Sequence, residues 1–126
     1  MTDLIQNQRD FMYLGSQTTT TYNEEQMELY SSLIEEEIKE LTDAIEPEEI
    51  IKEACDVLVV TLGFLLSMGI DVHKAWNLVH ANNMSKVSNQ DTIVKDENGK
   101  IMKSLESKVR KDKMMSDIEE LLDEVY

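Results

Sequence analysis

The feature that most constrains this chain is a long segment without charge. Val57 to Ile70 contains no Asp, Glu, Lys or Arg, although charged residues make up 30% of the 126-residue chain. Apolar positions at helical spacing predict a helix over about residues 48–68 that is apolar on nearly every side after Asp56. Such a helix must be covered all round. Because a chain of this size has few other elements, we expect a second subunit to complete the core.

Helical periodicity and end signals predict further helices on both sides of this segment. Gly15 is expected to end a first helix. Asn23 is expected to cap a long second helix, with Gln26 completing a capping box. Pro47 should end that helix and occupy the first turn of the next. The four helices predicted up to this point of the chain cover about residues 3–14, 24–46, 48–68 and 72–84.

The last third of the chain has a different character. Residues 92–103 read as two short strands around a turn, which predicts a β-hairpin. A basic segment, residues 107–115, then precedes a predicted acidic amphipathic helix over residues 116–126. The expected fold is therefore a single all-α domain, residues 1–126. It is a bundle of four to five helices, with catalytic helices at 23–86 and the hairpin and C-terminal tail at 90–126.

Composition excludes several classes of function. A net charge of −14 argues against binding to nucleic acid or to an anionic membrane, which both need a cationic surface. The single cysteine, Cys55, fits a reducing compartment and is expected to be a small buried hydrophobic residue. The N-terminus lacks the basic and apolar regions of a signal peptide, so we expect a cytoplasmic protein.

Acidic residues at three-residue spacing occur on two consecutive predicted helices. Glu37 and Glu40 lie on one, and Glu53 and Asp56 lie on the next, with twelve residues between the pairs. Positions three apart face nearly the same way on a helix. Since the turn at Pro47 makes the two helices antiparallel neighbours, both pairs can meet at one seam.

Four carboxylates at one seam repel each other unless a cation lies among them. By helical phase, Lys39 and Lys52 are expected to point elsewhere. Oxygen ligands without His or Cys select a hard divalent ion, so we expect Mg²⁺, with Mn²⁺ as a substitute. The alternative is that these acids form ordinary solvated faces.

The spacing of these acids carries a resemblance. Glu37-x-x-Glu40, twelve residues and Glu53-x-x-Asp56 resemble the signature of the all-α NTP pyrophosphohydrolases, the MazG-like and phosphoribosyl-ATP pyrophosphohydrolase-like superfamily. The segments "VHANNMSKV" and "DENGKIMKS" resemble a subgroup found in phages and bacteria, which would place the protein in a host cytoplasm if it is phage-encoded. The sequence after Lys103 has no counterpart of the proline-containing ending frequent in that subgroup.

The resemblance implies Mg²⁺-dependent cleavage of a nucleoside triphosphate to monophosphate and pyrophosphate by a homodimer or homotetramer. Glu37, Glu40, Glu53 and Asp56 would bind the metal. Glu36 would orient or deprotonate the attacking water, or is simply a solvated acid. Asn83 would form a hydrogen bond with the substrate, and Lys86 would bind a phosphate. From their place in the predicted hairpin, Lys100 and Lys103 are further candidates for binding phosphate.

Two alternatives stay open from the residues alone. Asn and Lys are both common at a helix C-terminus, so Asn83 and Lys86 also fit a purely structural role. The whole chain also fits a non-catalytic acidic helical oligomer that acts as a protein-interaction module.

The sequence does not distinguish among nucleotide substrates, between a dimer and a tetramer, or among numbers of metal ions. It also assigns no role to the N-terminal helix or to the basic segment 108–113.

Overall fold

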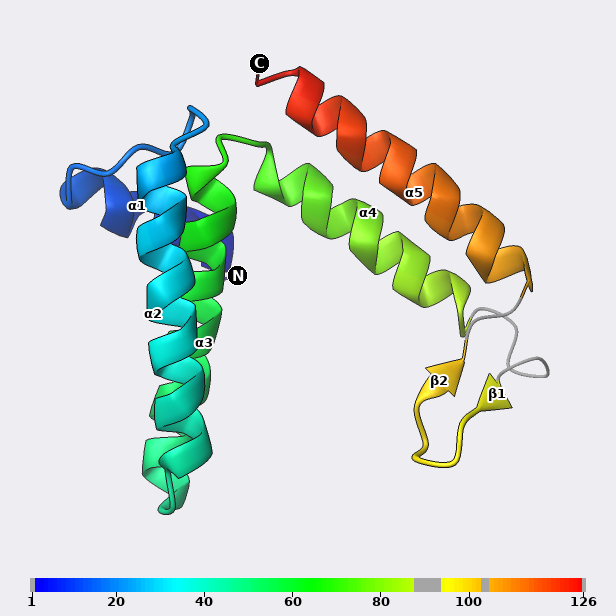
Figure 1. Ribbon diagram of the computed structural model, residues 1–126, viewed down its shortest axis with the longest axis horizontal. Helices are drawn as coiled ribbons and strands as arrows, with labels where there is room; N and C mark the ends of the chain where they lie inside the picture. The colour runs from blue at the N-terminus through cyan, green and yellow to red at the C-terminus, as the bar shows by residue number, and fades with distance from the viewer. Residues whose placement is uncertain (1, 88–93, 103–104, 126) are drawn as a thin grey trace. The chain divides into compact units, whose positions relative to one another are not determined.

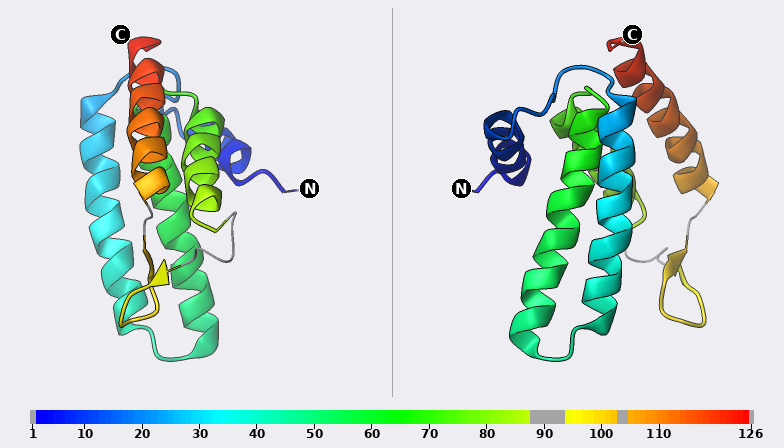
Figure 2. Two further views of the ribbon diagram at one scale, coloured as in Figure 1. Left: turned by 90° about the vertical axis from the view of Figure 1, so that its right-hand side faces the viewer. Right: turned by 60° about the vertical axis from the view of Figure 1, so that its left-hand side comes forward.

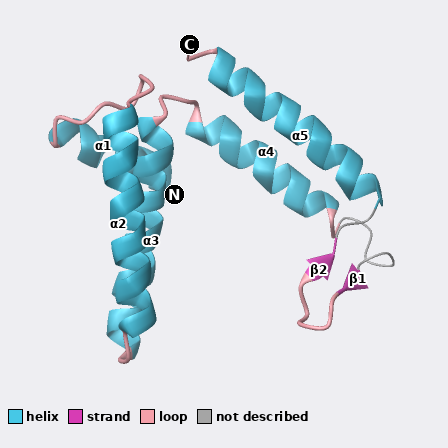
Figure 3. Cartoon of the chain, in the orientation of Figure 1, coloured by secondary structure: helices cyan, strands magenta, loops and turns pink. Residues whose placement is uncertain are grey.

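The computed structural model describes residues 2–87, 94–102 and 105–125 of the chain. The fold class is all-α, as predicted (Figures 1 and 3). The chain divides into two compact units, residues 1–72 and 73–124, and each is described by itself. The five helices among the described residues are α1 (Leu4–Leu14), α2 (Glu24–Asp43), α3 (Pro47–Ser67), α4 (Val72–Ser85) and α5 (Leu105–Asp123).

In the first unit, α2 and α3 form a helical hairpin on which the rest of the unit is built (Figure 2). Pro47 occupies the first turn of α3, where its missing N–H has no cost, as predicted. The ring of buried Tyr30 on α2 lies directly beside Gly63 on α3, where an added Cβ would be 2.1 Å from the ring. Only glycine permits this close approach, so this pair sets the distance between the two helices.

The segment between α1 and α2 is fixed by polar side chains at the top of this hairpin. Asn23 caps α2, and its Oδ1 accepts from the backbone N–H of Gln26 at 3.1 Å. The predicted capping box is only half formed, because the backbone N–H of Asn23 donates instead to the Ser67 carbonyl. The buried Gln26 amide group donates to the Thr18 carbonyl at 2.7 Å and to Ser67 Oγ at 2.8 Å. Gln26 therefore ties the loop to the end of α3.

The second unit contains α4, α5 and two very short strands. Lys74 of α4 and Glu124, which follows α5, form an ion pair of 4.0 Å. The predicted final helix is present, but it begins earlier than predicted, because the basic segment belongs to the same helix α5. No Gly or Pro interrupts Leu105–Asp123. The Lys113–Asp117 pair at 3.0 Å, one turn apart, joins the basic part to the acidic part.

The strands β1 (Val94–Lys95) and β2 (Ile101–Met102) pair antiparallel across a turn. In this turn Gly99 has a φ of +82°, which favours glycine. Strands of two residues do not make a sheet layer, so the fold remains all-α. Residues 92, 93 and 103 of the predicted hairpin lie outside the described residues, and the hairpin as a whole stays a prediction.

The apolar helix α3 keeps part of its apolar surface exposed. Leu58 is 55% exposed and Ile51 is 67% exposed.

The prediction that Cys55 is buried is wrong, because the thiol is exposed. Cys55 lies about 200° around the helix from Glu53, which faces α2. Among the described residues no single helix is long and apolar enough to cross a membrane. The helices α3 and α4 together meet the same criterion of length and composition, but the chain is bent between them.

Candidate metal centre

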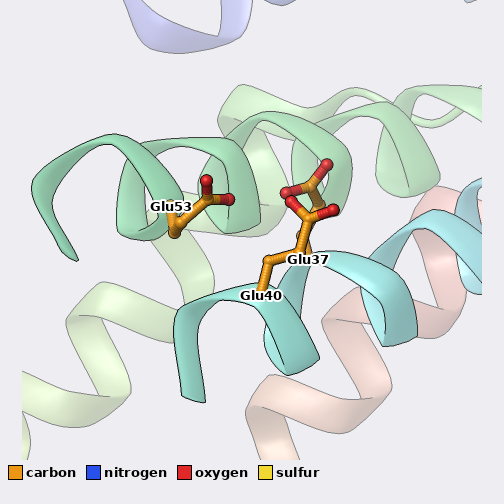
Figure 4. A group of neighbouring side chains, drawn as sticks. All are labelled: Glu37, Glu40 and Glu53. Carbon is orange, nitrogen blue, oxygen red and sulfur yellow. The ribbon is translucent and has the colours of Figure 1, made fainter. Parts of the chain in front are cut away.

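Three of the four predicted metal ligands meet at the seam between α2 and α3. Glu37 and Glu40 reach from α2 toward Glu53 on α3 (Figure 4). One carboxylate oxygen from each residue lies within 4.8 Å of the others. The three-residue spacing on α2 and the short connection before Pro47 produce this convergence, as the sequence predicted.

The cluster is partly removed from water. Glu37 and Glu53 are half-buried, whereas Glu40 is exposed. Oε2 of Glu37 and Oε2 of Glu53 are each buried without a hydrogen-bond partner among the described residues. Ionised carboxylates accept hydrogen bonds but cannot donate them to one another. A shared proton or a cation would offset the charge on these two buried oxygens.

The crowding of acids changes the protonation of Glu37. Partial burial and the nearby carboxyl groups of Glu40, Asp56 and Glu53 raise the pKa of Glu37 to about 7. Burial disfavours the charged form, and each nearby negative charge adds to that effect. At pH 7 about half of the metal-free molecules would thus carry a proton on Glu37, and a divalent cation would displace that proton.

Asp56 stands at the edge of the cluster and has a different partner. Its Oδ2 lies 2.8 Å from Nζ of Lys52, which also lies 3.2 Å from Oε1 of Glu53. These two acids hold the pKa of Lys52 above its ordinary value. The prediction that Lys52 points away from the acids is wrong. Lys52 and Asp56 are four residues apart on α3, and this spacing, which places side chains one above the other, could have identified the pair.

Glu36, the predicted catalytic acid, lies next to the cluster in sequence but is exposed. A rotation of about 100° per residue turns it away from the direction of Glu37. It is not among the three acids whose oxygens converge. Its role in activating water stays a prediction.

The predicted phosphate-binding residues belong to the second unit. The structure brings two of them together at the end of α4, where Nζ of Lys86 donates to Oδ1 of Asn83 at 3.2 Å. Lys100 is exposed in the turn between β1 and β2. Lys103 lies outside the described residues. The binding roles of all four residues stay predictions.

The donor set at the seam fits a hard divalent cation. Its ligand atoms are carboxylate oxygens, which Mg²⁺ and Mn²⁺ prefer. Each of the two buried oxygens, which have no hydrogen-bond partner within residues 2–87, 94–102 and 105–125, is compatible with a cation at this place. Glu37, Glu40 and Glu53 would hold such an ion, and Asp56 is the adjacent acid.

The comparison with known protein families agrees with this architecture. The sequence profile of the family described as phosphoribosyl-ATP pyrophosphohydrolase matches residues 4–83, which include α1, α2, α3 and all four predicted metal ligands. No curated protein sequence matches the chain. The family match covers more than half of the 126 residues. The chain therefore belongs to the phosphoribosyl-ATP pyrophosphohydrolase family, within the MazG-like all-α NTP pyrophosphohydrolase superfamily.

Proposed function

We propose that the protein is a Mg²⁺-dependent pyrophosphohydrolase that cleaves the α–β phosphate bond of a nucleoside or deoxynucleoside triphosphate. The products are the nucleoside monophosphate and pyrophosphate. The observation that carries the proposal is the convergence of Glu37, Glu40 and Glu53, with two buried oxygens that lack partners. Membership of a pyrophosphohydrolase family supports the reaction class.

The charge balance of the chain supports a cation-dependent reaction. A triphosphate approaching a protein of net charge −14 is repelled unless positive charge screens it. Divalent metal bound by Glu37, Glu40, Glu53 and Asp56 would supply that charge and polarise the phosphate oxygens. Mn²⁺ is the expected substitute for Mg²⁺, because it accepts the same oxygen ligands.

The remaining roles are assigned to side chains with the required chemistry. Glu36, as an exposed carboxylate beside the cluster, would orient the attacking water and accept its proton. Lys86, Lys100 and Lys103 would neutralise the polyphosphate, and Asn83 would donate a hydrogen bond to it. Eight of the twelve Lys and Arg residues lie at or beyond Lys86, so most basic residues follow the candidate metal ligands in the sequence.

Oligomerisation is part of the proposal. Exposed Leu58 and Ile51 on α3 are apolar side chains that a second copy would cover. We therefore expect a homodimer or homotetramer in the cytoplasm. The non-catalytic alternative, an acidic interaction module, uses the same exposed apolar surface but has no need of converging carboxylates with buried oxygens.

A substrate panel with product analysis tests the proposed function. The protein is incubated with the common NTPs, dNTPs, dUTP and phosphoribosyl-ATP, with Mg²⁺ or with EDTA. We expect a monophosphate and pyrophosphate from at least one substrate, only with Mg²⁺. A matched pair of variants, Glu53→Gln in the cluster and Glu49→Gln on the exposed part of α3, separates this activity from a contaminant. Hydrolysis that survives Glu53→Gln unchanged would contradict the proposal, and an inactive wild type would favour the interaction module.

A further inference from the structure

Lys52 is in contact with two acids of the candidate metal centre. Its Nζ lies 2.8 Å from Asp56 and 3.2 Å from Glu53. The lysine side chain is 65% exposed, whereas Glu53 is 15% exposed and Asp56 is 32% exposed. The ammonium group therefore covers two partly buried carboxylates from the solvent side.

A second lysine shows that this arrangement is more than an ordinary surface ion pair. Lys39 on α2 contacts Asp43 at 2.6 Å with the same four-residue spacing, and the two side chains are 77% and 64% exposed. Such solvated pairs contribute little to stability. Lys52 differs because it shares its charge between two acids. One of them, Glu53, also buries an unpartnered oxygen in the cluster.

We propose that Lys52 is the internal counter-ion of the metal-free centre and that a divalent cation displaces it from Glu53 and Asp56. Lys52 would thereby set the metal affinity of the centre. The inference rests on the proposed function, because it assumes that this cluster binds the metal.

The geometry supports displacement rather than coexistence. A carboxylate oxygen that binds an ammonium group at 2.8 Å has less negative charge to offer a metal ion. The ammonium group and a divalent cation on neighbouring oxygens also repel each other. Departure of Lys52 has a low cost, because its four-carbon side chain is flexible and already mostly exposed.

Metal titration of matched variants tests the inference without measuring activity. Mn²⁺ binding is measured by calorimetry for the wild type, Lys52→Met and Lys39→Met. Methionine has a helix propensity similar to that of lysine and a side chain of nearly the same length, but it carries no charge. We expect Lys52→Met to bind Mn²⁺ about fivefold more tightly, the effect of removing one partly screened charge. Lys39→Met should bind like the wild type.

A spectroscopic readout follows the displacement itself. The wild-type protein is labelled with ¹³C at the lysine Cε positions, and the missing peak in Lys52→Met identifies Lys52. Addition of Mg²⁺ should move the Lys52 peak toward that of a solvated lysine and leave the Lys39 peak in place. A Lys52 peak that does not move at saturating Mg²⁺ would overturn the inference.

The outcomes separate this inference from the proposed function. Unchanged or weaker Mn²⁺ binding by Lys52→Met, with normal binding by the wild type, would overturn the counter-ion role alone. A wild type that binds neither Mn²⁺ nor Mg²⁺ would overturn the metal centre and the counter-ion role together.

Discussion

Glu37 on α2 and Glu53 on α3 each bury one carboxylate oxygen that has no hydrogen-bond partner in the described part of the chain, and one oxygen of each lies within 4.8 Å of the other. A pair of acids in this position destabilises the fold whenever both are ionised. The repulsion between the two charges lowers the free energy of unfolding, as is common at functional sites.

Removing a single ligand charge should abolish hydrolysis while the fold persists. Glu53→Gln and Asp56→Asn keep the size of the side chain but weaken the hold on a divalent ion, so turnover should fall by orders of magnitude. Helical circular dichroism should be unchanged, and exposed Glu35→Gln on α2 is the control. Full activity in both cluster variants would show that the metal site is assigned to the wrong acids.

The stability of the metal-free protein should depend on pH through Glu37. Its pKa is raised from 4.5 to about 7 in the folded protein, so the folded state holds a proton that the unfolded chain has lost. This contribution is fully present below about pH 4.5 and is lost as the pH rises through about 7. In EDTA, Glu37→Gln should therefore gain melting temperature relative to the wild type between pH 4.5 and pH 8.

The same pair of proteins gives the control when metal is added. Mg²⁺ should stabilise the wild type more at pH 8 than at pH 5, because the ionised carboxylate is the ligand. Glu37→Gln should gain less from Mg²⁺ at pH 8. Parallel melting curves for the two proteins across this pH range would mean that Glu37 is not the titrating group.

The contact between Tyr30 and Gly63 should make α3 intolerant of alanine at one position. Gly63→Ala places a Cβ 2.1 Å from the Tyr30 ring. The Tyr30 ring or the helices must shift, and we expect a loss of about 1–3 kcal/mol in the free energy of unfolding, the usual cost of overpacking. Gly15→Ala is the control, since its φ is −85° and its nearest contact would be an ordinary 3.5 Å. Urea denaturation of both variants measures the difference, and equal stability would contradict this account of the packing.

The sequence was most informative where local periodicity decides the structure. Gly15 marks the end of α1, Asn23 the start of α2 and Pro47 the start of α3, as predicted, because each acts through its own backbone or side chain. The predicted end of α2 at Pro47 is wrong, because α2 already ends at Asp43. The convergence of Glu37, Glu40 and Glu53 was predictable from spacing and one short connection. These features depend only on neighbours within a few turns of the chain.

Features that depend on a side chain reaching to a distant partner were missed. Gln26 was assigned to a capping box, but its amide group bonds Ser67, 41 positions away in the chain. Helical phase predicts that Lys52 points away from the acids, but its long flexible side chain reaches an acid one turn away. Cys55 was placed in the core from the typical burial of its residue type, which ignores the face of α3 on which it lies.

The exposed apolar surface of α3 should be an interface between copies of the chain. Leu58 is 55% exposed in the single chain, so Leu58→Glu should dissociate the oligomer by placing a charge against apolar surface. Light scattering at micromolar concentration gives the mass. Val109→Glu on α5, where valine is 68% exposed, is the matched control. A stable, folded wild-type monomer would refute the interface.

The position of bond cleavage gives the sharpest test of the reaction. In the proposed reaction, metal bound by Glu37, Glu40 and Glu53 would polarise the phosphate oxygens. Lysines such as Lys86 would neutralise the departing pyrophosphate, and Glu36 would orient the attacking water. In ¹⁸O-labelled water, attack at the α-phosphorus puts the label in the nucleoside monophosphate, which we expect to see by mass spectrometry. Label only in pyrophosphate would move the attack to the β-phosphorus, and free phosphate as the first product would discard the pyrophosphohydrolase reaction.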